Sequence, residues 1–352
     1  MKAHAPAPAA SGPRLTLYLP GLFGNIHRLP PQGLRAALAL WPEPLARLLA
    51  RAESAPMPAR GAEAALFALF GVEPTDTAGL PVAAVGRVAD FGVVDREWWI
   101  RADPVHLEPR RDGLVLQAIA DLPETEAVAL TQDLADSLAQ EGWLLKIAAP
   151  TRWYLRPARE PQISTTTLPQ VLGRDIRPWL PQGPDGRAWH ARLNEAQILL
   201  HTASVNAERE AAGRLPVNSV WFWGGGSLPQ VPPARWGMVW THNPIAAGLA
   251  RLAGCTPAPP PADPQGLATG ISAPAMLVLD AALEAAYTGS AEAWCAEVAH
   301  IANTWILPLM ALVNSGDLDA LDLHTDAGFC YRYRRGQRWR FWRRDPLPGA
   351  AA

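Results

Sequence analysis

The sequence is poor in cysteine and has no excess of charge of one sign. Its three cysteines are too few and too scattered for a disulfide framework, and no C-x-x-C spacing is present for zinc or redox chemistry. The 31 lysines and arginines nearly balance the 33 aspartates and glutamates. No global electrostatic field therefore argues for nucleic acid or a membrane surface as an obligate partner. We expect a protein of the reducing cytoplasm.

Long apolar runs are also missing. No stretch approaches the ~18 uninterrupted apolar residues of a transmembrane helix, so the sequence predicts no membrane partner. Residues 1–12 are small and Pro-rich, and we expect them to be a disordered lead rather than a signal peptide. The chain is instead rich in proline (36 residues) and tryptophan (15 residues). Prolines divide a chain into short elements, and tryptophans supply large buried area.

The order of these short elements predicts an α/β fold. Leu15–Leu19 indicates a buried strand that stops at Pro20-Gly21, and Pro81–Phe91 indicates another strand. Residues 96–156 follow the order strand, strand, helix, strand, strand, which is typical of a compact α+β unit. We therefore predict a mixed sheet flanked by helices, with an inserted subdomain. The expected division is an α/β core of residues 13–95 and 170–328, an inserted α+β subdomain of residues 96–156, a linker of residues 157–169, and a C-terminal hairpin and tail of residues 329–352.

One segment carries a long specific pattern. Leu193–Pro229 reads LNEAQILLHTASVNAEREAAGRLPVNSVWFWGGGSLP. It resembles a passage of the archaeal-type, cofactor-independent phosphoglycerate mutases, where a helix with His-x-x-x-x-Asn-x-x-Arg precedes Asn-x-x-Trp-x-Trp-Gly-x-Gly and a proline. The positions that match are His201, Asn206, Arg209, Gly213, Pro216, Asn218, Trp221, Trp223, Gly224, Gly226 and Pro229. The resemblance implies an alkaline-phosphatase-like fold.

Four shorter strings resemble a smaller bacterial group, the RpfE-type regulatory proteins. They are RADPVHL (Arg101–Leu107), RWYL (Arg152–Leu155), the WFWGGG run and the FWRR end (Phe341–Arg344), and they recur in the same order. The chemistry of that group is unsettled, so this resemblance implies a regulatory role without naming a reaction.

The mutase resemblance also implies a site with two divalent metals, which this sequence does not provide for. Such a site needs an aspartate at the end of the first strand, further Asp and His ligands, and commonly an Asp-His pair late in the chain. Here the first strand ends in Pro20-Gly21, and no Asp-His dipeptide occurs. His300, His324 and Asp326 do not reproduce the D-x-x-x-H spacing. We therefore predict no metal, no cofactor and no catalytic residues of the mutase kind.

The glycine run Gly224–Gly226 is the first candidate for ligand binding. Three glycines after a strand let backbone N–H groups approach an anion, and Arg209 on the preceding helix adds a bidentate donor. The alternative is a tight turn, with Arg209 either capping the helix or paired to Glu195 or Asp185. Both interpretations stay open.

Two further groups of side chains are candidates for contact with a ligand. His201, Asn206, Asn218 and Trp223 belong to the matched pattern, although both asparagines are equally suited to satisfying backbone groups at the helix–strand junction. Arg101, Asp103 and His106 lie at the end of a predicted strand, where they orient a ligand or form a strand-end ion pair. The predicted ligand-binding residues are Arg101, Asp103, His106, His201, Asn206, Arg209, Asn218, Trp223, Gly224, Gly225 and Gly226.

The C-terminal run YRYRRGQRWRFWRR (Tyr331–Arg344) interleaves arginines with aromatic residues. This is the composition of a single-strand nucleic-acid surface. Alternation about Arg335-Gly336 also predicts an edge hairpin with aromatics packed inward and arginines solvated. We favour the hairpin because the chain as a whole is not basic, so nucleic acid is not the expected partner.

Three functional hypotheses follow. We favour a phosphoglycerate-mutase-like protein without the bimetal site that acts as a regulatory or small-anion-binding protein, with a phosphorylated small molecule or a protein as partner. The second is a phosphate-ester enzyme with an atypical site, either a mutase-like isomerase or a phosphohydrolase. The third is nucleic-acid binding through the C-terminal Arg/aromatic segment.

Overall fold

The chain divides into two compact units, each described here by itself. The computed structural model describes residues 13–24, 41–73, 79–111, 113–268, 273–288 and 291–343. Unit 1 comprises Met1–Ala65, Ala234–Asn243 and Gly254–Ala352, and unit 2 comprises Leu66–Pro233 and Pro244–Ala253. The predicted lead (1–12) and the end of the predicted tail (344–352) lie outside the described residues.

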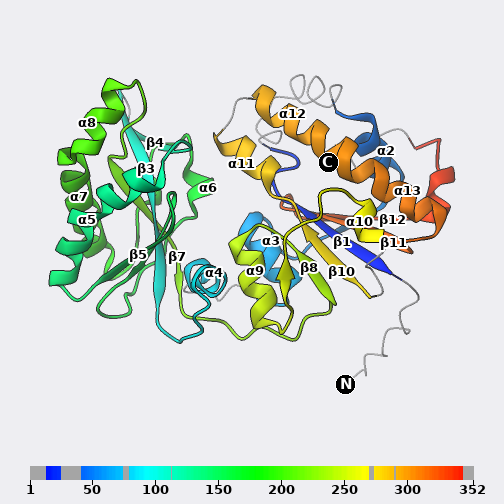
Figure 1. Cartoon of the computed structure of the whole chain (residues 1–352), viewed down its shortest axis with the longest axis horizontal. Helices are drawn as coiled ribbons and strands as arrows, with labels where there is room; N and C mark the ends of the chain where they lie inside the picture. Colours follow the sequence, from blue (N-terminus) through cyan, green and yellow to red (C-terminus); the bar gives the residue numbers. More distant parts are fainter. Residues whose placement is uncertain are drawn as a thin grey trace. The chain divides into compact units, whose positions relative to one another are not determined.

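Unit 1 is built on a mixed seven-stranded sheet (Figure 1). Its strands in spatial order are β2 (Glu53–Pro56), β12 (Phe329–Arg334), β11 (Ala320–Thr325), β1 (Arg14–Leu19), β10 (Ala275–Val278), β8 (Met238–Trp240) and β9 (Pro257–Ala258). The five strands from β11 to β9 run parallel; at one edge β12 pairs antiparallel with β11, and β2 pairs antiparallel with β12. The predicted α/β class with a mixed sheet is confirmed.

Helices cover one face of this sheet and close the core of unit 1. They are α2 (Glu43–Arg51), α12 (Ala291–Ile301), the π-helical segment η3 (Ala302–Ile306) and α13 (Leu307–Ser315). Their apolar side chains pack on Leu15, Leu17 and Leu19 of β1. The continuous helix Ala291–Ser315 is long and apolar enough to cross a membrane by composition alone. Because its inner face is part of this core, we assign it as a core helix.

Shorter elements complete unit 1. They are α10 (Gln265–Ala268), α11 (Ala281–Thr288) and the 3-10 helix η4 (Arg335–Trp339), while α3 (Ala62–Leu69) begins in unit 1 and continues into unit 2. Gly21 shows why α11 reaches the end of β1. A Cβ at this position would lie 2.3 Å from the Cα of Leu283, so only glycine permits the approach.

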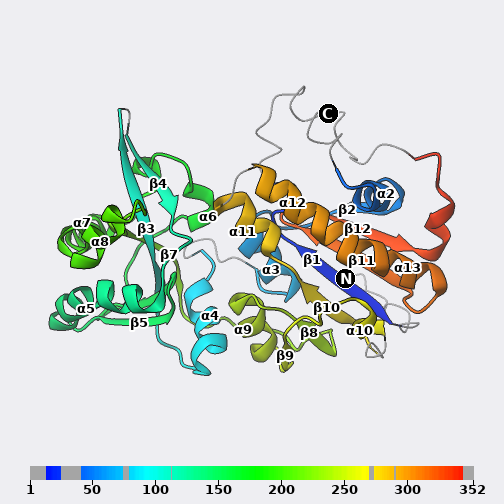
Figure 2. The same cartoon turned by 45° about the horizontal axis from the view of Figure 1, so that its top comes forward.

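Unit 2 is built around the long strand β3 (Trp99–Arg110), which pairs antiparallel with three strands. These are β4 (Gly113–Ala118), β6 (Arg152–Arg156) and β7 (Ser219–Gly226), and β5 (Leu144–Ala149) pairs with β6. One face carries α5 (Glu124–Gln140) and α7 (Gly186–Thr202), and α4 (Val82–Phe91) lies on the other, as Figure 2 shows. The remaining helices are α6 (Leu168–Val171), η2 (Arg177–Trp179), α8 (Ser204–Ala211) and α9 (Pro244–Leu252).

The prediction of a strand at Pro81–Phe91 is wrong, because these residues form α4. All seven residues from Val82 to Val88 are buried. A helix buried on most sides does not need polar residues at every third or fourth position, so its sequence shows no helical period. The helix ends at Gly92, whose φ of 68° provides a left-handed C-cap.

Unit 2 is larger than the inserted subdomain expected from the sequence. Besides residues 96–156 it takes in α4, α7 and β7. The reason is pairing, because β7 runs beside β3 from Val105↔Ser219 to Trp99↔Gly226 and α7 packs on that strand pair. Periodicity along the chain does not reveal such a long-range partner.

The predicted hairpin about Arg335-Gly336 is also wrong. β12 ends at Arg334 after pairing with β11 and β2, and the chain then enters η4. The turn of the observed hairpin lies earlier, between Thr325 and Phe329. Tyr331 and Tyr333 face inward as expected, but Trp339, Phe341 and Trp342, which follow β12, are exposed.

A close contact between α4 and α9 gives a test of the unit 2 packing. A Cβ at Gly248 would lie 2.1 Å from the carbonyl oxygen of Val85. We expect Gly248→Ala to lower the free energy of unfolding by about 1–3 kcal/mol, because the two helices must separate. The matched control is Gly336→Ala, which meets no atom within 4 Å. Urea denaturation of both variants measures the difference, and equal stability contradicts this packing.

Candidate functional site

A buried ion pair lies at the centre of the unit 2 sheet. The Nε and Nη2 atoms of Arg101 donate to Oδ1 of Asp103 at 2.9 and 2.7 Å. The indole Nε1 of Trp223 donates to Oδ2 at 2.7 Å, and the backbone N–H of Trp153 donates to Oδ1 at 3.3 Å. The guanidinium also lies 5.2 and 5.3 Å from the rings of Tyr154 and Trp223. One carboxylate thus connects β3, β6 and β7.

Solvent has little access to this network. Arg101 and Asp103 are 7% and 2% exposed. Burial raises the pKa of the Asp103 carboxyl, and the Arg101 guanidinium and the Trp223 indole oppose that rise. The hydrogen-bonded partners are what make the buried charges tolerable. Arg101 and Asp103 therefore form an ion pair within the sheet, and Trp223 donates a hydrogen bond to it. None of these three residues lines either of the two hollows described below.

Asn206 and Arg209 occupy the junction between α8 and β7. The Asn206 amide donates to the carbonyls of Leu200 and Val217 at 2.7 and 2.8 Å, and its oxygen accepts from the Val217 N–H at 2.8 Å. Arg209 is fully buried. Four of its five N–H groups reach Leu215, Asp121 and Glu126. The ion-pair partners of Arg209 are thus Asp121 and Glu126, before and within α5, rather than Glu195 or Asp185.

His106 and Asn218 tie the end of β3 to the segment that leads into β7. The Asn218 oxygen accepts from the Leu107 N–H at 2.7 Å, and its amide donates to the Leu107 carbonyl at 3.0 Å. This side chain continues the β3–β7 ladder in place of a backbone pair. The Nδ1 atom of His106 lies 2.9 Å from the Pro216 carbonyl oxygen. Both residues serve the local backbone, as Asn206 does.

The glycine run is the end of β7 rather than a loop after it. A Cβ at Gly224 would lie 2.7 Å from Cβ of Val82, and one at Gly226 would lie 2.7 Å from Cβ of Pro81. A Cβ at Gly225 would lie 2.4 Å from the Trp98 ring. The three glycines therefore let β7 pass directly beneath the start of α4 and beside an indole.

Two members of the matched pattern, His201 and Asn218, line an open hollow, and of the two it is His201 that is exposed. It lines a groove of about 510 Å³ with Asn194, Gln197 and Asn218, and the apolar side of the groove includes Leu107. Asn194, Gln197 and His201 are spaced three and four residues apart, so they share one face of α7. His201 and Asn194 are exposed and Gln197 is half-buried. We call this hollow the His201 groove.

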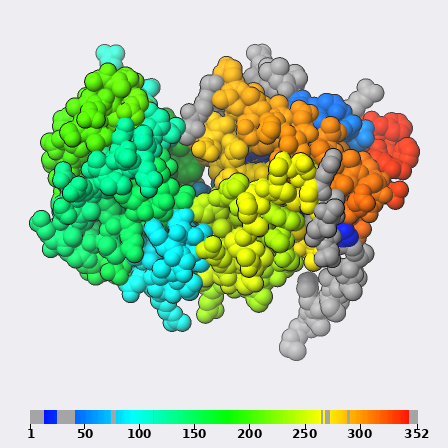
Figure 3. Space-filling model, viewed as in Figure 1, coloured from blue at the N-terminus to red at the C-terminus, as the bar shows by residue number. Residues whose placement is uncertain are grey.

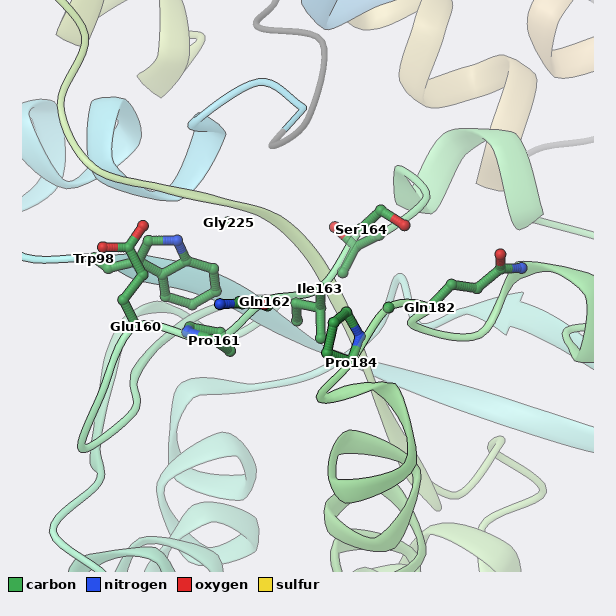
Figure 4. A pocket seen from close by; sticks show the side chains of 11 residues that line it. Trp98, Glu160, Pro161, Gln162, Ile163, Ser164, Gln182, Pro184 and Gly225 are labelled. Carbon is green, nitrogen blue, oxygen red and sulfur yellow. The ribbon is translucent and has the colours of Figure 1, made fainter.

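A second hollow lies beside the glycine run (Figure 4). Its volume is about 410 Å³, and Trp98 and Gly225 line it together with two polar loops, residues 160–165 and 182–184. Figure 4 shows Trp98 at one end and Ser164 and Gln182 at the other. We call this hollow the Trp98 pocket.

The carboxyl ends of the parallel strands in unit 1 are where an α/β sheet usually binds ligands. Here β1 ends at Pro20-Gly21, and the Gly21 N–H donates to Oδ1 of Asp326 at 3.1 Å. Asp280, after β10, accepts from the Asn243 amide at 2.8 Å. Each carboxylate is thus held by a neutral donor.

The metals implied by the alkaline phosphatase superfamily do not fit these residues. Among the described residues no three His, Cys, Asp or Glu side chains are grouped as a metal would require. His324, near the end of β11, has its pKa lowered to about 4 by burial, and its buried Nδ1 has no hydrogen-bond partner. It stands opposite Cys330 in the register of β11 and β12.

Several residues of the two hollows were missed from the sequence. Gln162 and Ser164 lie in the segment predicted to be a linker (residues 157–169). The polarity of this segment was the one feature of the sequence that could have indicated a binding site there. Asn194 and Gln197 were detectable, because polar residues seven and four positions before His201 on a predicted helix share its face.

Comparison with known proteins points to one family. No protein-family model matches the chain. A 2,3-bisphosphoglycerate-independent phosphoglycerate mutase of Methanosarcina barkeri is 35% identical over 65 residues, which are 18% of this chain and 16% of that protein. A probable mutase of the same kind from Geobacter sulfurreducens is 24% identical over 177 residues, 49% of this chain and 44% of that protein. The chain thus spans less than half the length of these curated relatives.

One solved structure shares the architecture of this chain. The PH0037 protein of Pyrococcus horikoshii superposes with a TM-score of 0.52 at 13% identity, covering 91% of this chain and 86% of that one. A cofactor-independent phosphoglycerate mutase from Thermoplasma acidophilum covers 93% of this chain and 90% of its own, with a TM-score of 0.45 and 20% identity. The sequence matches establish that this chain is homologous, over about half of its length, to the cofactor-independent phosphoglycerate mutases.

Proposed function

We propose that this chain is a phosphoglycerate-mutase-like protein of the cytoplasm that binds a small anion, such as a phosphorylated metabolite. On this proposal it acts through binding, as a regulatory protein related to the RpfE type, rather than through two-metal phosphoryl transfer. The homology to mutases supports the choice of a phosphorylated ligand. The His201 groove supplies the place.

The observation that carries the proposal is the contrast between the exposed His201 and those predicted residues that are buried in the scaffold. Arg101, Asp103, Asn206 and Arg209 are engaged in the scaffold. His201 instead stands at a groove with the amides of Asn194 and Gln197 on the same helix face. Imidazole and amide N–H groups are donors to phosphate and carboxylate oxygens, and an imidazolium adds charge. The ring and the amides can therefore meet one small anion together.

Removal of the groove donors tests this proposal. We expect His201→Ala and Asn194→Ala each to weaken the binding of 3-phosphoglycerate and inorganic phosphate by about tenfold, because each removes a charge-assisted or neutral hydrogen bond. Isothermal titration calorimetry measures the affinities. The matched control is Arg187→Gln, which removes an exposed cation from the same helix outside the groove.

Two outcomes contradict the proposal in different ways. Equal affinity in the wild type and His201→Ala shows that the anion does not bind in the groove. Turnover of 2- or 3-phosphoglycerate with manganese or zinc that survives repurification shows that the protein is an enzyme, and its loss in His201→Ala places that activity in the groove.

A second candidate function rests on the segment after β12. We propose single-stranded nucleic acid as its partner. Trp339, Phe341 and Trp342 are 63%, 68% and 65% exposed, whereas the hairpin hypothesis placed the aromatics inward. Figure 3 shows this C-terminal segment, in red, at the surface. Arg335 and Arg343 are exposed beside them. Exposed rings flanked by arginines are suited to stacking on bases and pairing with phosphates.

The salt dependence of binding tests this second function. We expect a fluorescent oligothymidine to bind with an affinity that falls steeply between about 50 and about 200 mM salt. The triple variant Trp339→Ser, Phe341→Ser, Trp342→Ser removes binding. The double variant Arg335→Glu, Arg343→Glu makes the dependence of log affinity on log salt concentration less steep, by about one unit of slope per lost phosphate contact. Val94→Ser, at a valine that is 67% exposed, is the surface control. Fluorescence anisotropy that shows no salt-sensitive binding rejects this function.

A further inference from the structure

The Trp98 pocket is a preformed hollow whose walls are fixed by backbone contacts. Ser164 and Gln182 exchange two backbone hydrogen bonds at 2.9 and 3.0 Å, which joins the two polar loops. The Asp185 carboxylate accepts from the Gln162 N–H at 2.8 Å, just before α7 begins. Gly183 has a φ of +111°, and a Cβ there would lie 2.7 Å from the Gln162 carbonyl oxygen. The loops therefore hold their positions without a ligand.

The indole of Trp98 forms the apolar wall of the pocket. Its other side packs on the unit 2 core, with the Trp189 ring centroid 6.3 Å away in an edge arrangement. Gly225 makes this placement possible, because any side chain there would overlap the Trp98 ring. An indole held in this way offers a flat apolar surface of fixed orientation to a ligand.

The polar groups of the pocket define the ligand by charge. Gln162 and Gln182 contribute amides, Ser164 and Thr165 contribute hydroxyls, and Glu160 contributes a carboxylate. No lysine, arginine or histidine is among the described residues that line it. Amides and hydroxyls both donate and accept hydrogen bonds, and the carboxylate only accepts. The pocket therefore suits a neutral molecule with several hydroxyl groups and is unsuited to phosphate.

We propose that the Trp98 pocket binds a neutral sugar ring, with the C–H face of the ring on the Trp98 indole. The hydroxyls at the ring edge meet the amides of Gln162 and Gln182 and the carboxylate of Glu160. A pocket with one aromatic wall and a few convergent polar groups is the usual form of a small-molecule site. This site is separate from the His201 groove and does not depend on the anion proposal.

A titration panel tests the sugar site. The probes are glucose, mannose and N-acetylglucosamine, with choline as a cation and inorganic phosphate as an anion. We expect saturable binding of at least one sugar, followed by tryptophan fluorescence and by saturation-transfer NMR. Gln162→Ala and Gln182→Ala weaken it by about tenfold, and Gly225→Ala removes it by forcing the indole into the pocket.

Matched controls separate this site from folding and from the groove. Gln170→Ala removes an exposed amide in α6 outside the pocket, and Gly336→Ala adds a methyl group in open space. Both variants, and His201→Ala, keep the wild-type sugar affinity. Circular dichroism and thermal melts verify that each pocket variant is folded.

Three results overturn the proposal. They are the absence of saturable binding for every sugar at millimolar concentration, tighter binding of choline or phosphate than of any sugar, and equal sugar affinity in the wild type and both glutamine variants. Loss of phosphate binding in His201→Ala with sugar binding retained supports two separate sites.

Discussion

The hydrogen-bonded pair of Arg101 and Asp103 is the interaction on which the rest of unit 2 depends. A buried carboxylate requires that all its partners be in place, and here they come from three different strands. Once Trp153 and Trp223 donate to Asp103, the registers of β6 and β7 beside β3 are set. The helices packed on those strands then take their positions. The His201 groove lies between α7 and the strands β3 and β4, and the Trp98 pocket lies between the end of β7 and two loops.

This constraint explains what the mutase-like pattern does in this chain. The His-x-x-x-x-Asn-x-x-Arg segment spans the end of α7 and most of α8, and with the Trp-x-Trp-Gly strand it builds the junction between α8 and β7. Asn206 closes the turn between α8 and β7, and Arg209 anchors it to Asp121 and Glu126. In this chain, both side chains serve the scaffold. The surfaces that remain for binding are formed by groups outside the pattern, such as Asn194 and Trp98, together with His201.

Close approach of backbones is the second constraint, and it is a steric one. Gly224, Gly225 and Gly226 each lie where a Cβ would overlap a neighbour, respectively Val82, Trp98 and Pro81. In a strand interior glycine normally weakens the structure, so its use here reflects the space that α4 and the indole require. The same run that resembles an anion-binding loop in the sequence is thus explained by packing, and no lysine, arginine or histidine is among the described residues that line the pocket beside it.

The sequence by itself determined the α/β class, helix α5 (Glu124–Gln140), the strands β1 and β6, and the matched helix–strand segment, because these depend on local periodicity and on a long specific pattern. Only the tertiary structure decided that Pro81–Phe91 is a helix buried on most sides, that the glycine run is a paired strand, and that Trp339 is exposed after β12 ends. The burial of the helix and the pairing of the glycine run depend on partners distant in the sequence, and the exposure of Trp339 depends on where the pairing of β12 ends. Local patterns carry no information about such partners. The polar groups of the two hollows come together for the same reason.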